Sequence, residues 1–204
     1  MKGAKQATLK LPNGETIQPK ELVRWLRIWF NSNLTFKQHI AIRTSQARSA
    51  FQRLARLANI ERGLSPLAIR QLYLACITSV ADYGSVIWWK GQAYAKKPLQ
   101  VLQNLALRKI LGVFKTAPII PMEVEAALQP PSVRLNTSVW KYAIRQLKLA
   151  PKHPIRQLFQ DETIGLQAYR IKESIASLGD LSSLEPIQHF YFPPWGKTTL
   201  YYNN

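Results

Sequence analysis

The first thirty residues show the alternation of hydrophobic and polar positions that is typical of short β-strands. Residues 7–18 alternate on both sides of the segment Pro12-Asn13-Gly14, whose residue types favour a tight turn, so they predict a β-hairpin. Residues 22–30, LVRWLRIWF, are rich in β-branched and aromatic side chains and predict one strand, with a short helix as the alternative. Because the side-chain period of a strand is two, one face of this strand would carry Trp25, Arg27 and Trp29.

From residue 35 the hydrophobic period lengthens to about 3.6 residues, which predicts helices. The first helix is expected from Thr35 to Asn59, with Thr35 and Gln38 placed to form a capping box. Its buried face is predicted to comprise Phe36, Ile40, Ala47, Phe51, Leu54 and Ala58. The second helix is expected to begin at Ser65, an N-cap residue, with Pro66 at its first position. Its buried stripe is predicted to comprise Ile69, Leu72, Tyr73, Cys76, Ile77 and Val80.

Glycine and proline divide the rest of the chain into further elements. Gly84 interrupts the second helix, and the apolar run at 85–89 is expected to continue inward. A third helix is predicted over 98–111 and ends at Gly112, with a buried face of Leu99, Leu102, Ala106 and Ile110. Beyond it we expect a short helix at 122–128, a long one at 132–149 that buries Val139, Ala143, Ile144 and Leu147, weaker helices near 155–160 and 163–178, and an extended tail over 186–204.

These elements predict a mainly α fold, a helical bundle with a small N-terminal β hairpin and strand. Its core is expected to hold side chains from the first three long helices, namely Phe51, Leu72, Ile77, Leu102 and Ile110. Three regions follow from this pattern: a β hairpin and strand at 1–34, the helical bundle at 35–150, and a helical arm with a Pro- and aromatic-rich tail at 151–204.

The chain carries a large positive charge that is unevenly distributed. Its 28 Lys and Arg against 11 Asp and Glu give a formal net charge of +17 and a pI near 10.3. Residues 1–156 hold 25 basic and 6 acidic residues, a net charge of +19, whereas residues 157–204 have a net charge of −2. This balance indicates a polyanionic partner, either nucleic acid or an anionic membrane face. The longest uncharged runs are too short to span a bilayer. The predicted partner is nucleic acid, and no membrane is predicted.

The residue types of a catalytic or metal site do not come together in the sequence. The eleven carboxylates are scattered, no phosphate-binding glycine loop occurs, and the single cysteine and three histidines lack metal-ligand spacing. Cys76 falls on the apolar stripe of the second helix and is expected to be a buried structural thiol. His39 is expected at the surface or half-buried, with no acid–base partner in reach. We therefore predict no catalytic residue, no metal and no cofactor.

The positive signal is a set of basic residues interleaved with aromatic ones. Arginines alternate with tryptophans in residues 24–29, punctuate the first helix and recur at the end of the third. Such a pattern binds phosphates without reading base sequence. The side chains predicted to contact nucleic acid are Arg24, Lys37, Arg48, Arg53, Arg56, Arg108, Lys109 and Lys115. The alternative is that these side chains form ordinary solvated helix faces.

Short motifs follow one another in a definite order along the chain. The first are VRWLRIWFN at 23–31, LTFKQHI at 34–40, RGLSP at 62–66, RQLYLAC at 70–76 and YG with WW at 83–89. The later ones are QNLALRKILG at 103–112, TAP at 116–118, EAALQP at 125–130, HP at 153–154 and PPW at 193–195. In this order the motifs resemble the reverse transcriptase of non-LTR (LINE-type) retrotransposons in the region that follows its palm. The resemblance covers roughly residues 7–196.

The resemblance implies a thumb and connection region between the palm and a downstream RNase H domain. In that family the thumb helices hold a template–primer duplex by its backbone, so it also implies a palm-containing polymerase as partner and a nuclear location. The palm aspartates and the RNase H acid cluster of the family have no counterpart in these 204 residues, which implies a non-catalytic fragment. Arg27 stands where the family has glycine and Asn31 where it has aspartate, and these departures suggest a decayed copy of an element.

The leading interpretation is thus a non-catalytic fragment that binds RNA–DNA or RNA duplex independently of sequence. One alternative is a helical protein-interaction module, with an exposed contact patch made by Trp88, Trp89 and Trp140. Another is a peripheral membrane protein with a basic amphipathic helix. Salt-dependent retention on nucleic acid distinguishes the first interpretation, and co-sedimentation with vesicles distinguishes the last.

Overall fold

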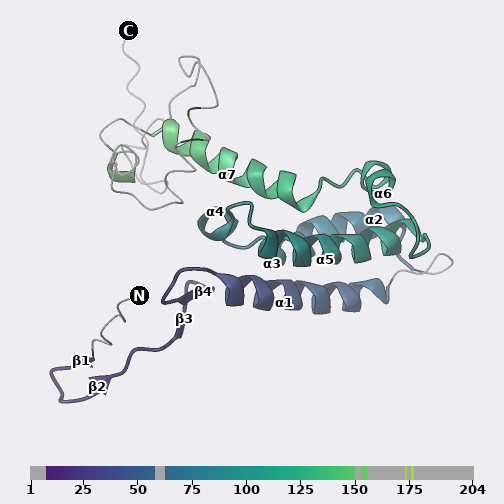
Figure 1. The fold of residues 1–204 in the computed structure, drawn as a ribbon. Helices are drawn as coiled ribbons and strands as arrows, with labels where there is room; N and C mark the ends of the chain where they lie inside the picture. Colours follow the sequence, from purple (N-terminus) through teal and green to yellow (C-terminus); the bar gives the residue numbers. More distant parts are fainter. Residues whose placement is uncertain (1–7, 58–62, 150–152, 156–172, 174–175, 177–204) are drawn as a thin grey trace, which may run out of the picture. The chain divides into compact units, whose positions relative to one another are not determined.

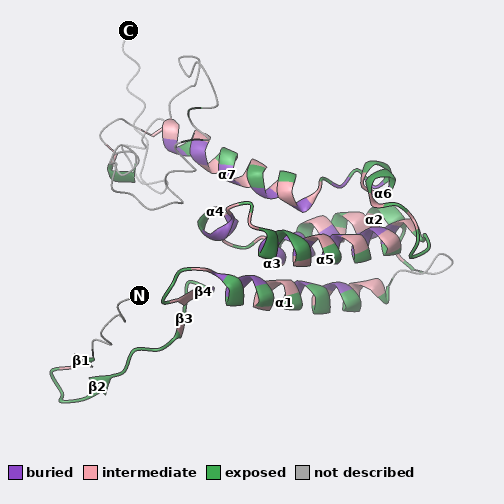
Figure 2. Ribbon diagram, viewed as in Figure 1, coloured by how far each residue is buried: buried purple, intermediate pink, exposed green. Residues whose placement is uncertain are grey.

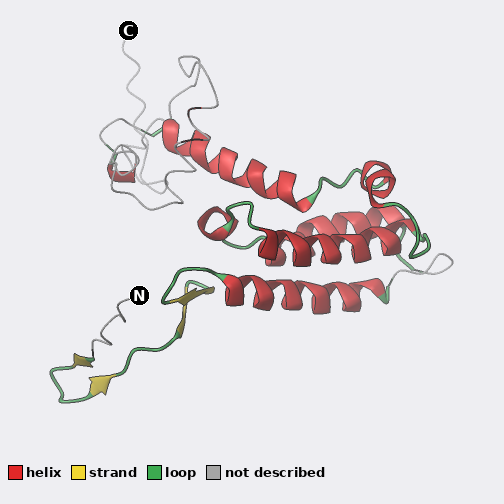
Figure 3. Cartoon of the chain, viewed as in Figure 1, coloured by secondary structure: helices red, strands yellow, loops and turns green. Residues whose placement is uncertain are grey.

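Two antiparallel β-hairpins precede the helices in the part of the chain that the structure describes (Figure 1; Figure 3). In this computed structural model the described residues are 8–57, 63–149, 153–155, 173 and 176. Strands β1 (Leu9–Lys10) and β2 (Thr16–Ile17) form the first hairpin. The Leu11 N–H donates to the Glu15 carbonyl at 2.8 Å across its turn, and Gly14 there has a left-handed φ of 84°. The hairpin predicted for this segment is confirmed.

The second hairpin replaces the single strand predicted over 22–30, so that prediction is wrong. Strands β3 (Leu22–Trp25) and β4 (Ile28–Asn31) pair antiparallel, with Arg24 opposite Trp29. The chain therefore reverses direction in the middle of the predicted strand. The three residues expected to share one strand face, Trp25, Arg27 and Trp29, therefore do not share one.

The turn of this second hairpin is held by distant side chains. Leu26 and Arg27 have left-handed φ values of 46° and 63°, the values that two-residue hairpin turns require and that glycine adopts most easily. The Tyr83 hydroxyl donates to the Leu26 carbonyl at 3.1 Å, and Arg43 Nη2 donates to the Arg27 carbonyl at 2.6 Å. These hydrogen bonds stabilise a turn that the local sequence does not favour.

Helix α1 (Lys37–Ala55) confirms the first predicted helix but begins differently. Its N-cap is Phe36, with φ 57° and no side-chain cap bond, so the capping box predicted for Thr35 and Gln38 is wrong. Asn31 instead accepts the Thr35 N–H at 2.9 Å and donates to the Thr35 hydroxyl at 2.9 Å. The predicted buried face is confirmed at Phe36, Ile40, Ala47 and Phe51, whereas Leu54 is half-buried and Ala58 lies outside the described residues.

The second predicted helix is divided by a π-helical segment. Helix α2 (Pro66–Leu72) is followed by the π segment η1 (Tyr73–Ile77) and then by α3 (Thr78–Ala81). The Ser65 hydroxyl accepts the Ala68 N–H at 3.3 Å, which confirms Ser65 as the N-cap. A π segment holds more residues per turn than an α-helix, so side chains beyond its start rotate relative to an unbroken helix.

This rotation changes which residues are buried. The buried side chains recur every four positions, at Ile69, Tyr73, Ile77 and Ala81. Cys76 is exposed, so the prediction of a buried thiol is wrong. Leu72 and Val80 are only half-buried, and Leu72 therefore does not belong to the core as predicted.

A left-handed glycine precedes the next helix, α4 (Ser85–Trp88), and another follows the end of α5 (Ala93–Leu111). Helix α4 begins after Gly84, and α5 ends at Gly112, as predicted. Helix α5 starts five residues before the predicted 98, with Pro98 inside it.

Helix α6 (Ile119–Glu125) lies three residues earlier than the predicted helix at 122–128. It ends early because Ala127 has a φ of 47°. Arg70 donates from Nε and Nη2 to the carbonyls of Ala126 and Ala127, which satisfies this helix end.

Helix α7 (Pro131–Leu147) confirms the long helix predicted over 132–149. Val139 and Ala143 are buried as predicted, whereas Ile144 and Leu147 are half-buried. The weaker helices predicted near 155–160 and 163–178 and the tail at 186–204 fall almost entirely outside the described residues.

The chain divides into two compact units, residues 1–136 and 137–204, and each is described by itself. In the first unit α1 packs against α3, η1 and α5, and β4 contacts α1. Figure 2 shows the buried side of α1 turned toward α3 and α5. This core includes four of the five predicted residues, Phe51, Ile77, Leu102 and Ile110. The fold is mainly α with small β-hairpins, as predicted.

The tryptophans do not form the exposed patch expected for an interaction module. Trp88 and Trp89 are each 1% exposed, so that prediction is wrong for both, and Trp140 is 44% exposed. The Trp89 indole donates to Asn136 Oδ1 at 2.7 Å, as a buried indole requires. Within the described residues, no helix combines the length and the apolar character needed to cross a membrane.

A side chain at Gly84 would be crowded by the end of the Ile28 side chain. A Cβ there would lie 2.9 Å from Ile28 Cδ1, and the φ of 68° is left-handed. Gly112 has a similar φ of 65° but open space at its Cβ position. We expect Gly84→Ala to lower the free energy of unfolding by about 2–4 kcal/mol and Gly112→Ala by about 1–2 kcal/mol, measured by urea titration.

Ile28→Val, combined with Gly84→Ala, provides the control for this steric explanation. It removes the Cδ1 methyl group that a Cβ at Gly84 would strike, so Gly84→Ala should cost less stability in the Ile28→Val background than in the wild-type chain. Equal destabilisation by the two glycine variants, or the same cost of Gly84→Ala in both backgrounds, would contradict the close approach.

Candidate nucleic-acid interface

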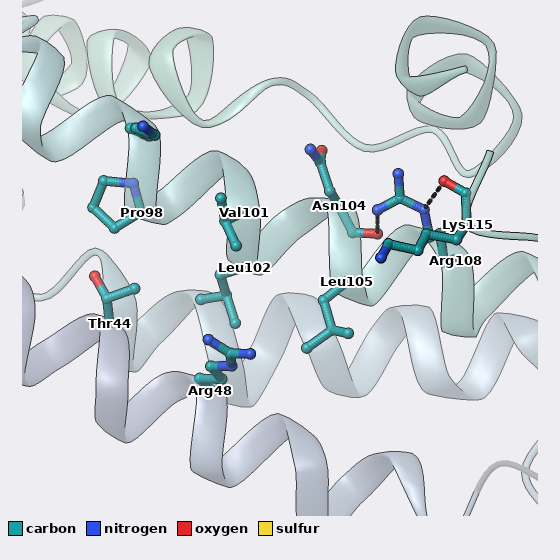
Figure 4. A pocket seen from close by; sticks show the side chains of 10 residues that line it. Thr44, Arg48, Pro98, Val101, Leu102, Asn104, Leu105, Arg108 and Lys115 are labelled. Carbon is teal, nitrogen blue, oxygen red and sulfur yellow. Dashed lines mark hydrogen bonds between the residues drawn. The ribbon is translucent and has the colours of Figure 1, made fainter. Parts of the chain in front are cut away.

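A basic groove of about 610 Å³ lies between α1 and α5 (Figure 4). Its lining comprises Thr44, Arg48, Lys97, Pro98, Val101, Leu102, Asn104, Leu105, Arg108 and Lys115. Among these described residues four are cations and none is a carboxylate. The groove is therefore an electropositive recess that suits a polyanion.

Helical periodicity places the lining residues. On α1, Thr44 and Arg48 are four residues apart and so share one face. On α5, the spacing of three to four residues brings together Lys97, Val101, Leu105 and Arg108. Val101 and Leu105 are 51% and 37% exposed, so an apolar floor lies between the cations.

Arg108 connects the groove to the loop that follows α5. Its Nη1 donates to the Asn104 carbonyl at 3.3 Å and its Nε to the Lys115 carbonyl at 3.2 Å, as drawn in Figure 4. These bonds fix the position of the guanidinium and of the Lys115 backbone. Arg48 and Lys97 are exposed, and their charges face solvent at the groove.

The structure brings together only some of the residues predicted to contact nucleic acid. Three of the eight line the groove: Arg48, Arg108 and Lys115. The others do not line it, although all are exposed: Arg24, Lys37, Arg53, Arg56 and Lys109. Two of these lie over aromatic rings, Arg24 at 5.6 Å from the centre of Trp29 and Lys37 at 5.5 Å from that of Tyr94.

Lys97 is the groove residue that the sequence interpretation misses. The sequence predicts a helix start at Pro98 and so leaves Lys97 in the preceding loop, whereas α5 begins at Ala93. The sequence does contain a signal for Lys97, its helical spacing with Val101 and Arg108. A helix predicted to start before residue 97 would have placed Lys97 on that face.

His39 is fully buried, so its expected position at the surface or half-buried is wrong. The Trp29 N–H donates to its Nδ1 at 3.3 Å, so Nε2 carries the proton and donates to the Tyr83 carbonyl at 3.3 Å. The Trp88 indole donates to the same carbonyl at 2.8 Å. Burial lowers the pKa of His39, the bond to Tyr83 opposes this, and the Arg43 charge adds to the lowering. His39 thus acts as a neutral structural link.

Asp82 and Glu123 take part in a partly buried polar network. Asp82 accepts from Arg134 Nε at 2.6 Å and from Nη2 at 3.2 Å. Burial alone would lower the pKa of Arg134, but the bonds and charge of Asp82 outweigh it and raise that pKa. Gln103, fully buried, accepts from Arg134 Nη1 at 2.8 Å and donates to Glu123 at 3.0 Å. Burial also raises the pKa of the Tyr73 hydroxyl to about 12.

Comparison with known proteins gives relatives of one kind. No family model matches the chain, and no solved structure matches it. Over 144 residues it is 26% identical to a retrovirus-related Pol polyprotein from type-1 retrotransposable element R1 of Nasonia vitripennis. Over 93 residues it is 31% identical to a probable RNA-directed DNA polymerase from transposon BS of Drosophila melanogaster. A putative 115 kDa protein in element R1DM of the same fly is 25% identical over 125 residues.

The chain is related to non-LTR retrotransposon polyproteins. The three alignments cover 71%, 46% and 60% of this chain but only 36%, 10% and 12% of the respective relatives. The chain thus spans about a third or less of the length of these retrotransposon proteins.

The motifs that resemble retrotransposon reverse transcriptase serve mainly to build the fold. Tyr83 offers the carbonyl that His39 and Trp88 share, and Gly84 permits the close approach of Ile28. Arg70 satisfies the end of α6. These motif residues therefore support the fold, whereas of the four groove cations only Arg108 belongs to a motif, the one at 103–112.

The lowered pKa of His39 predicts a specific pH dependence of stability. Between the ordinary pKa of 6.5 and the lower pKa of the folded state, His39 is protonated in the unfolded chain but not in the folded chain. The free energy of unfolding should therefore fall as the pH drops from 6.5 through this window. His39→Gln, which keeps an amide donor for Tyr83, should flatten this dependence in urea titrations between pH 7.5 and 5.

His153→Gln is the matched control because His153 lies outside the helical core of the first unit. The control should leave the slope unchanged. An unaltered slope in His39→Gln would show that the titration of His39 does not couple to folding.

Proposed function

We propose that the groove between α1 and α5 binds the backbone of a nucleic-acid duplex, an RNA–DNA or RNA template–primer, without regard to base sequence. The observation that carries this proposal is the convergence of four cations, Arg48, Lys97, Arg108 and Lys115, with no carboxylate among the described lining residues. Phosphates bound there would release counterions, which is the main source of affinity in sequence-independent binding.

The polar groups of the groove favour positioning over base recognition. Recognition of base edges needs side-chain donors and acceptors that are available to the ligand. The side-chain carbonyl oxygen of Asn104 accepts from Gln100 Nε2 at 3.0 Å, and Thr44 Oγ1 is buried. The groups that remain are Asn104 Nδ2, the cations and the exposed apolar side chains of Val101 and Leu105. These support contacts with phosphates and sugars, which carry no sequence information.

The relatives suggest the assembly in which such binding would serve. One of them is named a probable RNA-directed DNA polymerase. The motif order resembles the thumb and connection region after the palm of such enzymes, and a helical bundle with a basic groove is consistent with a thumb. We propose that this chain corresponds to that region and that a palm-containing polymerase is its partner.

We also propose that these 204 residues are not catalytic by themselves. Nucleotidyl transfer with two metal ions needs carboxylates that converge on one site. In the described part, Asp82 is paired with Arg134, and Glu123 accepts from Gln100 and Gln103. Glu125 lies exposed on α6, two positions after Glu123, and residues two apart on a helix point to different sides.

Charge reversal in the groove tests duplex binding. The double variant Arg48→Glu/Lys97→Glu should weaken binding to an RNA–DNA hybrid and to two unrelated duplexes by the same factor. It should also reduce the slope of log affinity against log salt by about 0.9 for each phosphate that the groove no longer binds. Fluorescence anisotropy at several salt concentrations measures both quantities.

Lys10→Glu/Lys20→Glu is the matched control, because it changes the net charge equally at exposed residues that do not line the groove. It should retain most of the affinity. Equal weakening by both double variants would assign binding to net charge rather than to the groove. Tighter binding to anionic vesicles than to any duplex would instead favour the peripheral membrane alternative.

Primer extension tests the absence of catalysis. Purified protein with magnesium, deoxynucleotides and a primed RNA template should give no extended primer above a protein-free blank. Extension that co-purifies with the chain and disappears when the chain is removed would overturn this part of the proposal.

A further inference from the structure

Phe114 has the most exposed large hydrophobic side chain among the described residues, 86% open to solvent. It follows the end of α5 and directly precedes Lys115, whose side chain lines the groove. A single exposed hydrophobic residue is ordinary. An exposed aromatic ring beside a recess for phosphates is less so, because aromatic rings bind nucleobases.

Hydrogen bonds fix the loop that carries Phe114. The Val113 N–H donates to the Arg108 carbonyl at 3.2 Å, and the Ala117 N–H donates to the Phe114 carbonyl at 3.1 Å, which closes a turn. Arg108 Nε donates to the Lys115 carbonyl at 3.2 Å (Figure 4). The backbone on both sides of Phe114 is thus tied to an arginine that itself lines the groove.

We propose that Phe114 stacks on an unpaired nucleobase of the nucleic acid whose phosphates occupy the groove, an inference that rests on the proposed function. Stacking adds affinity without sequence preference because every base has a π face. Inside a duplex these faces are covered by neighbouring base pairs, whereas a single-stranded extension exposes them. The preferred ligand is therefore a duplex with a single-stranded extension.

The exposed apolar residues of α6 offer a competing use of the same region. Ile120 and Val124, one helical turn apart, are each 75% exposed. These two side chains form an exposed apolar pair that would suit a protein partner. The bonds of the Phe114 loop lead to Arg108 on α5, at the groove, and this connection favours the nucleic acid.

The test compares three ligands that share one RNA–DNA hybrid: blunt, with a five-nucleotide extension, and with an extension of abasic sites. Phe114→Ala should lower the affinity for the extended hybrid by about tenfold and leave the blunt and abasic ligands unchanged. The salt slope should stay the same because the variant keeps every cation that binds phosphate. Phe114→Trp should retain the affinity, and Ile120→Ala, the matched exposed control, should have no effect.

Each other outcome overturns the proposal in a recognisable way. Salt-dependent binding of the wild-type chain that Phe114→Ala leaves unchanged would refute stacking and leave duplex binding intact. Equal weakening on the extended and abasic ligands would assign Phe114 a structural or phosphate-positioning role. Equal weakening by Phe114→Ala and Ile120→Ala would show that the effect is not specific to Phe114 and would refute stacking. Absence of wild-type binding to all three ligands would refute both the stacking and the proposed function.

Discussion

The carbonyl of Tyr83 is the hydrogen-bond acceptor on which the arrangement of the first unit depends. It accepts one hydrogen bond from His39 on α1 and another from the Trp88 indole on α4. The other nitrogen of His39 accepts the Trp29 N–H of β4, so one junction joins the second hairpin, α1 and the corner before α4. The Trp88 carbonyl in turn accepts from Gln92 Nε2 at 2.7 Å, just before α5. The junction thus lies close to the starts of α1 and α5, the two helices that line the groove.

The positions of the long helices are easier to predict from the sequence than the turns and irregular segments between them. Periodicity identifies α1, α5 and α7, because each buries one continuous stripe. Leu26 and Arg27 defeat the strand prediction, since their turn depends on bonds from Tyr83 and Arg43, far away in the sequence. The π segment η1 exposes Cys76 by changing the number of residues per turn, which no hydrophobic pattern records.

The candidate site is predictable only in part, for a related physical reason. Arg48, Arg108 and Lys115 are anticipated from charge, but charge alone does not show which cations converge. Convergence depends on the packing of α1 against α5, which brings together helix faces that are distant in the sequence. The resemblance to retrotransposon proteins concerns residues such as Gly84 and Arg70, which shape the backbone. Of the cations in the proposed binding groove, Arg48, Lys97 and Lys115 lie outside these motifs, and only Arg108 belongs to one.

The described lining residues of the groove include four cations and no carboxylate, so no acidic side chain there offsets the repulsion between the cations on its two walls. Arg48 on α1 faces the cations of α5 across the recess, and like charges at such an interface repel, most strongly at low ionic strength. A bound polyanion would remove this repulsion, and it would bind the folded chain more tightly than the unfolded one because the lining cations converge only in the folded state. Occupancy of the groove would then raise the melting temperature by mass action, so that the folding equilibrium itself reports on the ligand.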